Sequence, residues 1–155
     1  MSEQNPIRVF VTHAWAEDED YVRVFEFLES SPNFYYRSCG SAESRGVSAG
    51  VDDDIEEQRE ALRVQMRPAE LVIATAGLLR QHSSLLVFQM TFARSASKSV
   101  LLLPEFGVAT PIPKGVQNLA TETVGWDERA LVGAIRRLAR GEETGRWDTV
   151  EFSLD

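Results

Sequence analysis

The stretch Thr12-His13-Ala14-Trp15 contains the side chains best placed to act on a ligand. It follows the apolar run Ile7 to Val11 and precedes an acidic segment. Because α/β folds place ligands at the carboxyl ends of parallel strands, we expect these four residues to line a binding site. Backbone amides at the start of the following helix would hold a pyrophosphate there. The structural alternative is that His13 satisfies a backbone group while Trp15 packs over the loop.

Other reactive patterns are weak in this sequence. A serine-histidine hydrolase needs a nucleophile beside a base, but the only imidazoles are His13 and His82, and no serine lies in a GxSxG context. No glycine-rich phosphate motif follows a strand-like segment. The acidic run at 52–54 is better explained as the start of a helix than as a cation site. We therefore expect no metal and no resident cofactor.

Composition and charge favour one small cytoplasmic domain. The net charge of −8 over 155 residues would repel nucleic acid and anionic membranes, so neither is an expected partner. The lone Cys39 excludes an intrachain disulfide and fits a reducing compartment. Residues 1–6 lack the pattern of a secretory signal, and no apolar run approaches the about 20 residues that cross a bilayer.

Strand-like and helix-like segments alternate along the chain. The expected strands are 7–12, 34–39, 71–75, 100–103 and 122–125, and the expected helices are 17–30, 52–66, 84–96 and one that ends at Gly141. Right-handed crossovers then predict an α/β fold, a flavodoxin-like three-layer sandwich with a mostly parallel five-stranded sheet. The loops at 40–50 and 104–119 are long, as ligand-binding loops often are.

The chain divides into a domain at 7–140 and a C-terminal tail at 141–155. In the tail, Val150, Phe152 and Leu154 alternate as in a strand, and Trp147 lies just upstream. We expect this tail to form an added edge strand or a self-association segment.

Three motifs resemble the TIR-like domain family. VFVTHAW is similar to the family's first strand and loop, RPAELVIATAGLL to its third strand and exit loop, and IPKGVQNLATETVGW to its late segment. Within this family, the chain resembles the branch that belongs to the prokaryotic antiphage system called Thoeris. The resemblance implies cleavage of NAD+ to nicotinamide and an ADP-ribose-derived, cyclic or modified immune signal that acts on an effector protein.

In this family the helix after the third strand carries a W-x-x-[YF]-E pattern with a catalytic glutamate. The corresponding residues here are Leu85-Leu86-Val87-Phe88-Gln89, so the resemblance assigns Gln89 to the catalytic position and Phe88 to the ligand site. A glutamine can hydrogen-bond ribose hydroxyls but cannot stabilise positive charge on the sugar, which predicts a rate loss on the order of 10² to 10³. The expected pocket lies between the first strand's exit loop, the 40–50 loop and the helix bearing Gln89.

Three alternatives stay open at this point. Glu105, after the fourth strand, or Glu43, in the second loop, could replace the missing acid, although an exposed loop charge is the simpler interpretation of each. A non-catalytic scaffold or nucleotide-sensing module would instead act through self-association. A receiver-like phosphoacceptor is disfavoured because residues 74–76 are Ala-Thr-Ala, where that class needs an acid.

Overall fold

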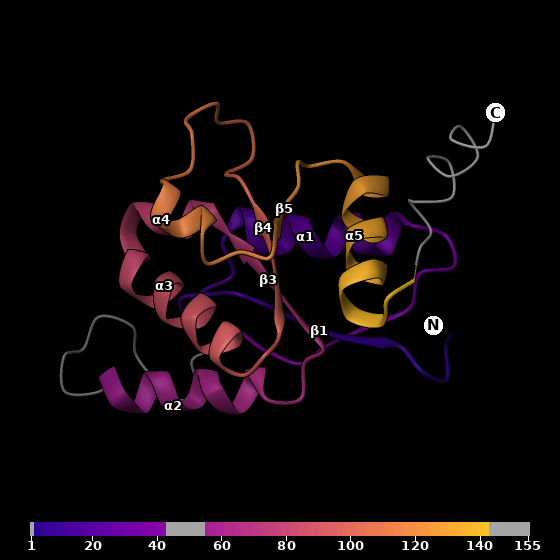
Figure 1. The fold of residues 1–155 in the computed structure, drawn as a ribbon, viewed down its shortest axis with the longest axis horizontal. Coiled ribbons are helices and arrows are strands. Elements are labelled where there is room, and N and C mark those ends of the chain that lie inside the picture. Colours follow the sequence, from indigo (N-terminus) through magenta and orange to yellow (C-terminus); the bar gives the residue numbers. More distant parts are fainter. Residues whose placement is uncertain (1, 43–54, 143–155) are drawn as a thin grey trace.

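Five parallel strands form one sheet. The computed structural model describes residues 2–42 and 55–142, and its strand order is β2-β1-β3-β4-β5 (Figure 1). The strands are β1 (Ile7–Val11), β2 (Tyr36–Ser38), β3 (Leu71–Thr75), β4 (Ser99–Leu103) and β5 (Glu122–Thr123), and every pairing between them is parallel. This order is the flavodoxin-like one, so the predicted fold class is confirmed.

Helices cover both faces of the sheet. They are α1 (Glu19–Ser30), α2 (Ile55–Met66), α3 (Leu79–Ser95), α4 (Lys114–Gln117) and α5 (Glu128–Arg140), with a 3₁₀ turn, η2 (Ala76–Leu78), before α3. In Figure 1, α2 and α3 lie on one side of the strands and α1 and α5 on the other. The two helical layers and the sheet between them form the three-layer arrangement.

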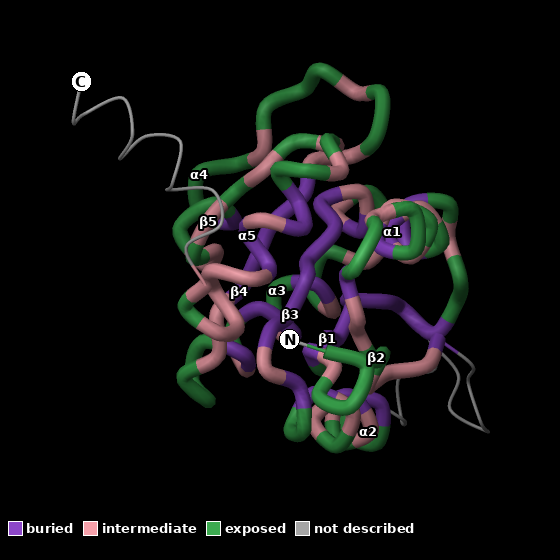
Figure 2. Tube along the Cα trace, turned by 90° about the vertical axis from the view of Figure 1, so that its right-hand side faces the viewer, coloured by how far each residue is buried: buried purple, intermediate pink, exposed green. Residues whose placement is uncertain are grey.

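Alternate residues of the central strands point into two separate cores. Along β3, Val72 and Ala74 pack with α2 and α3, whereas Leu71 and Ile73 pack with α1 and α5. All five residues of β3 are buried, and Figure 2 shows the buried segments concentrated along the central strands. A parallel strand covered on both faces is apolar throughout, which is why the continuous apolar run at 71–75 predicted this strand.

Helix ends follow from local sequence. Asp18 caps α1 by accepting a hydrogen bond from the Tyr21 N–H at 2.8 Å, and Asp127 caps α5 in the same way. Gly141 ends α5 at φ 69°, the left-handed conformation that glycine adopts without steric cost. These residues fix where each helix begins relative to the preceding strand.

Several helix and strand boundaries differ from those predicted from the sequence. The helix expected at 84–96 begins at Leu79, directly after η2, and is kinked at His82, whose φ is −136°. The short helix α4 was not predicted, and β5 has two residues rather than four. The tail from 143 to 155 lies outside the described residues, so its expected edge strand or self-association role stays a prediction.

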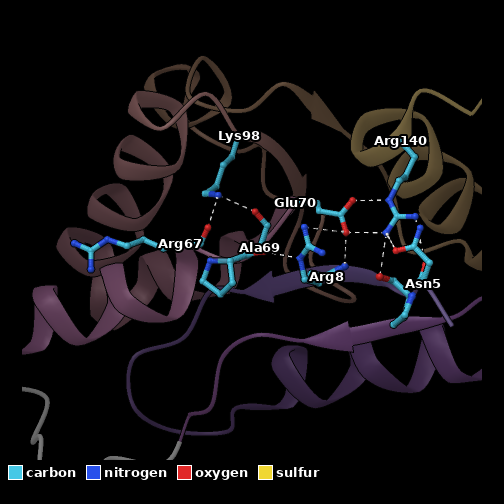
Figure 3. Close-up of polar contacts among 9 residues, drawn as sticks. Asn5, Arg8, Arg67, Ala69, Glu70, Lys98 and Arg140 are labelled. Carbon is cyan, nitrogen blue, oxygen red and sulfur yellow. Dashed lines mark hydrogen bonds and ion pairs between the residues drawn. The ribbon is translucent and has the colours of Figure 1, made fainter. Parts of the chain in front are cut away.

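At the amino-terminal edge of the sheet, a charged network joins distant segments (Figure 3). Arg140, at the end of α5, donates to both carboxylate oxygens of Glu70 and to the backbone carbonyls of Asn5 and Pro6. Glu70 also accepts from the Arg8 N–H at 3.0 Å. The network therefore ties the start of β1, the start of β3 and the last helix together, on the edge opposite the carboxyl ends of the strands.

Within residues 2–42 and 55–142, every helix is too short or too polar to span a bilayer.

Candidate functional site

The loop after β1 is packed into the protein rather than open to solvent. Thr12 and His13 are fully buried, and Ala14 and Trp15 are 6% and 9% exposed. The Thr12 N–H donates to the Ile73 carbonyl at 2.9 Å, and the Thr12 hydroxyl accepts from the Thr75 N–H at 3.2 Å. These two bonds continue the β1–β3 pairing past the end of the strand, and they fix the loop's starting direction.

Gln89 binds the backbone of this same loop. Its Oε1 accepts from the His13 N–H at 3.1 Å, and its Nε2 donates to the His13 carbonyl at 2.9 Å. The second amide hydrogen is donated to the Leu85 carbonyl, one turn earlier in α3, at 3.0 Å. The side chain is fully buried. Its amide therefore holds the β1 loop against α3 and presents no surface to a ligand in this structure.

The His13 ring extends this network to the loop after β2. Its Nδ1 accepts from the Trp15 N–H at 3.1 Å, so Nε2 carries the proton of the neutral ring and donates to Gln65 Oε1 at 2.9 Å. Gln65, on α2, also bonds both backbone groups of Ser41. Burial lowers the pKa of His13 below its ordinary value and favours this neutral form.

The structure brings only some of the predicted site residues together. Gln89 and His13 are in direct contact, but the space between them is closed by their own hydrogen bonds. Phe88 lies between α2 and α3, with the guanidinium of Arg59 5.3 Å and that of Arg63 5.2 Å from its ring centre. Most of the 40–50 loop, including Glu43, lies outside the described residues, so its contribution to a pocket stays a prediction.

A cleft of about 390 Å³ opens nearby, where β1, β3 and β4 end at the same edge of the sheet. It is lined by Ala14, Ala16, Asp18, Glu19, Asp20, Arg23, Gly77, Leu78, Arg80, Gln81, His82, Glu105 and Phe106. We call it the Asp20 cleft. Ala14 is the one member of the predicted β1-loop set on its wall, and Glu105 is the acid that the sequence offered as an alternative. Gln89 is not on this wall.

Asp20 fixes the geometry of one wall of the cleft. Its Oδ1 accepts from Arg23 at 2.9 Å, and its Oδ2 accepts from the Phe106 N–H at 3.2 Å. Burial raises the pKa of Asp20, although these two bonds oppose the rise. A Cβ on Gly77 would lie 3.0 Å from Oδ2, so glycine gives the carboxylate room. The Arg23 guanidinium stacks 3.8 Å above the Phe106 ring.

Sequence reasoning missed Asp20 as part of a site. An acid in the first turn of a helix is stabilised by the helix dipole, and the stretch from Glu17 was interpreted only in that way. One signal was available: Asp20 is separated from the end of β1 by a short loop, at the edge where ligands bind.

The lining of the cleft also includes an ion pair. Arg80 Nε donates to Glu105 Oε1 at 2.7 Å, and the two side chains are 66% and 30% exposed. Guanidinium groups bind phosphates, and a carboxylate stabilises positive charge that develops on a sugar. The cleft therefore carries two guanidinium groups, each of which is paired with a carboxylate: Arg23 with Asp20 and Arg80 with Glu105. Within the described residues, no cluster of three or more histidine, cysteine or carboxylate side chains could hold a metal ion.

These features define a flavodoxin-like α/β domain with a charged, ligand-sized cleft at the carboxyl edge of its sheet. Compared with known proteins, the chain matches no protein-family model and no curated sequence. One solved structure with a similar fold is the CMP N-glycosidase BcmB of Clostridium botulinum. It shares 16% sequence identity, the alignment covers 83% of this chain and 96% of that one, and the TM-score is 0.43. A similarity of this size carries no argument about function.

Proposed function

We propose that this chain binds NAD+ or an ADP-ribose-type nucleotide in the Asp20 cleft. The observation that carries the proposal is the presence, in one cleft at the carboxyl edge of the sheet, of two guanidinium groups, Arg23 and Arg80, and a part-exposed carboxylate, Glu105, which pairs with Arg80. The motif resemblance to TIR-like domains supports the choice of this ligand. By the same resemblance, we propose that the protein acts in antiphage defence and produces a signal for an effector protein.

If the bound NAD+ is cleaved, Glu105 is the acid that we expect to take part. The bond between nicotinamide nitrogen and ribose C1′ breaks with its electron pair leaving on nicotinamide, and positive charge builds on the ribose. Water then adds to C1′ and loses a proton, or a hydroxyl of the ADP-ribose does so to give a cyclic product. Glu105 is in the cleft and 30% exposed at its side chain, whereas Gln89 is buried and uncharged.

A non-catalytic nucleotide-binding module is the second candidate. The Glu105 carboxylate is already paired with Arg80, and the family's catalytic position is a glutamine committed to the His13 backbone. A domain of this kind would bind the nucleotide, leave it intact, and act through self-association.

Calorimetry and mass spectrometry on the same samples separate these candidates. NAD+ and ADP-ribose are titrated into the wild type, Glu105→Gln and the exposed α1 control Glu26→Gln, and NAD+ incubations are analysed for nicotinamide. Cleavage through Glu105 predicts that nicotinamide release falls on the order of 10² to 10³ in Glu105→Gln while NAD+ still binds. Binding without release in every form supports the module. Failure of the wild type to bind either nucleotide contradicts the proposal.

A further inference from the structure

A second hollow adjoins the Asp20 cleft. Its volume is about 340 Å³, and its lining is Ala76, Leu79, Arg80, Glu105, Val108, Thr110, Pro111, Ile112 and Pro113. Apart from Thr110, the side chains that belong to this hollow alone are apolar. We call it the apolar hollow.

The two spaces share one wall. Arg80 and Glu105 line both of them, and their 2.7 Å ion pair stands at the boundary. On one side of the pair lie the charged groups of the Asp20 cleft, including Asp20 and Arg23. On the other side lie the aliphatic surfaces of the apolar hollow, such as Val108 and Ile112. A space lined by several charged side chains and a space lined mainly by aliphatic ones therefore share this pair of side chains.

The walls of the apolar hollow are held in place by hydrogen bonds. The Val108 N–H donates to the Glu105 carbonyl at 3.2 Å, and Gln117 Nε2 donates to the Ile112 carbonyl at 2.6 Å. At the start of the loop, Trp126 Nε1 donates to the Pro104 carbonyl at 2.7 Å. Since a preformed hollow costs less to fill than a collapsed one, these hydrogen bonds favour binding in it.

We propose that the site takes a ligand of two chemically different parts, oriented by this boundary. A flat ring occupies the apolar hollow, the sugar-phosphate part occupies the Asp20 cleft, and the bond between them lies against Arg80 and Glu105, so that a positive charge on the ring nitrogen faces the Glu105 carboxylate. This inference rests on the proposed function, so the ring is the nicotinamide of NAD+ and the cleft holds its ADP-ribose part. Phosphates are then near Arg23, and the ribose hydroxyls are near Glu105.

The test fills the apolar hollow while leaving the Asp20 cleft intact. Val108→Trp adds an indole to a residue that lines only the apolar hollow, and Val22→Trp adds the same group to an exposed position on α1. Calorimetry with NAD+ and with ADP-ribose is run on the wild type and both variants. We expect NAD+ affinity to fall by about tenfold or more in Val108→Trp, because the ring loses its buried site, while ADP-ribose affinity changes by no more than about twofold.

The possible outcomes distinguish failure of the two-compartment inference from failure of the proposed function. Unchanged NAD+ affinity in Val108→Trp, or equal losses for both nucleotides, overturns the two-compartment inference and leaves the proposed function standing. A wild type that binds neither nucleotide overturns both. If Val108→Trp does not fold, Pro111→Trp, at an exposed position on the same wall, is measured with the same two ligands.

Discussion

The carboxamide of Gln89 is hydrogen-bonded through both its oxygen and its nitrogen to the backbone of His13, 76 residues earlier in the chain. A carboxylate at position 89 could accept from the His13 N–H, but it could not donate to the His13 and Leu85 carbonyls. The hydrogen bonds at position 89 therefore require a side chain that both accepts and donates. This requirement explains the glutamine without reference to any reaction.

We expect Gln89→Glu to destabilise the protein without producing activity. The His13 and Leu85 carbonyls would lose the donor that Gln89 provides and would face a buried charge, at a cost of about 1–3 kcal/mol or more in unfolding free energy. The exposed change Gln4→Glu is the matched control and should stay within about 0.5 kcal/mol. Urea unfolding measures both, and nicotinamide release is assayed in parallel. A Gln89→Glu protein of wild-type stability that cleaves NAD+ faster than the wild type would contradict this structural role.

Acidification is expected to weaken the fold through His13. Its pKa is lowered in the folded protein, so the unfolded chain binds the proton first as pH falls below about 6.5. The contribution of the neutral ring is fully present above that pH and is lost toward lower pH. Unfolding free energies of the wild type and His13→Gln, measured from pH 7.5 to 5, should converge on acidification. Parallel curves would rule out His13 as the titrating group.

The Arg140–Glu70 pair should make a measurable contribution to stability. Both side chains are less than one-fifth exposed, so solvent screens the pair less than a surface ion pair. Arg140→Met leaves Glu70 and the carbonyls of residues 5 and 6 without this donor, and we expect a loss of about 1–3 kcal/mol by urea unfolding. The exposed α5 change Arg129→Met should have little effect.

The pH dependence provides a second check on that pair. The hydrogen bond from Arg140 lowers the pKa of Glu70, so its stabilisation is present above the unfolded pKa of about 4.5 and is lost as pH falls below it. Arg140→Met should therefore lose less stability than the wild type on acidification from pH 6 to 3. An equal loss in both proteins would argue against the pairing.

Two glycine-to-alanine changes should have opposite effects. A Cβ at Gly40 would lie 2.7 Å from two ring atoms of Phe10 and 2.9 Å from Gln65 Oε1, so Gly40→Ala should cost about 1–3 kcal/mol through overpacking. A Cβ at Gly133, within α5, meets nothing within 4 Å, and Gly133→Ala should gain about 0.5–1 kcal/mol through helix propensity. Thermal unfolding of both variants decides this, and a tolerated Gly40→Ala would contradict the packing around Gln65.

The sequence determined the architecture of the sheet because burial on both faces requires apolar strands. β3 and β4 are continuous apolar runs, and the helices that cover them carry apolar residues at helical spacing. The sequence also predicted that the β1 loop and Glu105 lie at the carboxyl edge of the sheet, because each directly follows a strand and parallel strands end at the same edge. Boundaries such as the start of α3 were missed because the turn Ala76–Leu78 has no distinctive residue type.

Only the tertiary structure decided which of these residues face a cavity. In the sequence, Gln89 is a polar residue on a mostly apolar helix. Asp20 is one of several acids in the first turn of a helix. The fold buries Gln89 against the His13 backbone and turns Asp20 toward Arg23 and Phe106 on a cleft wall. The physical reason is that a hydrogen bond between residues distant in sequence depends on how the layers pack, and local spacing does not encode that packing.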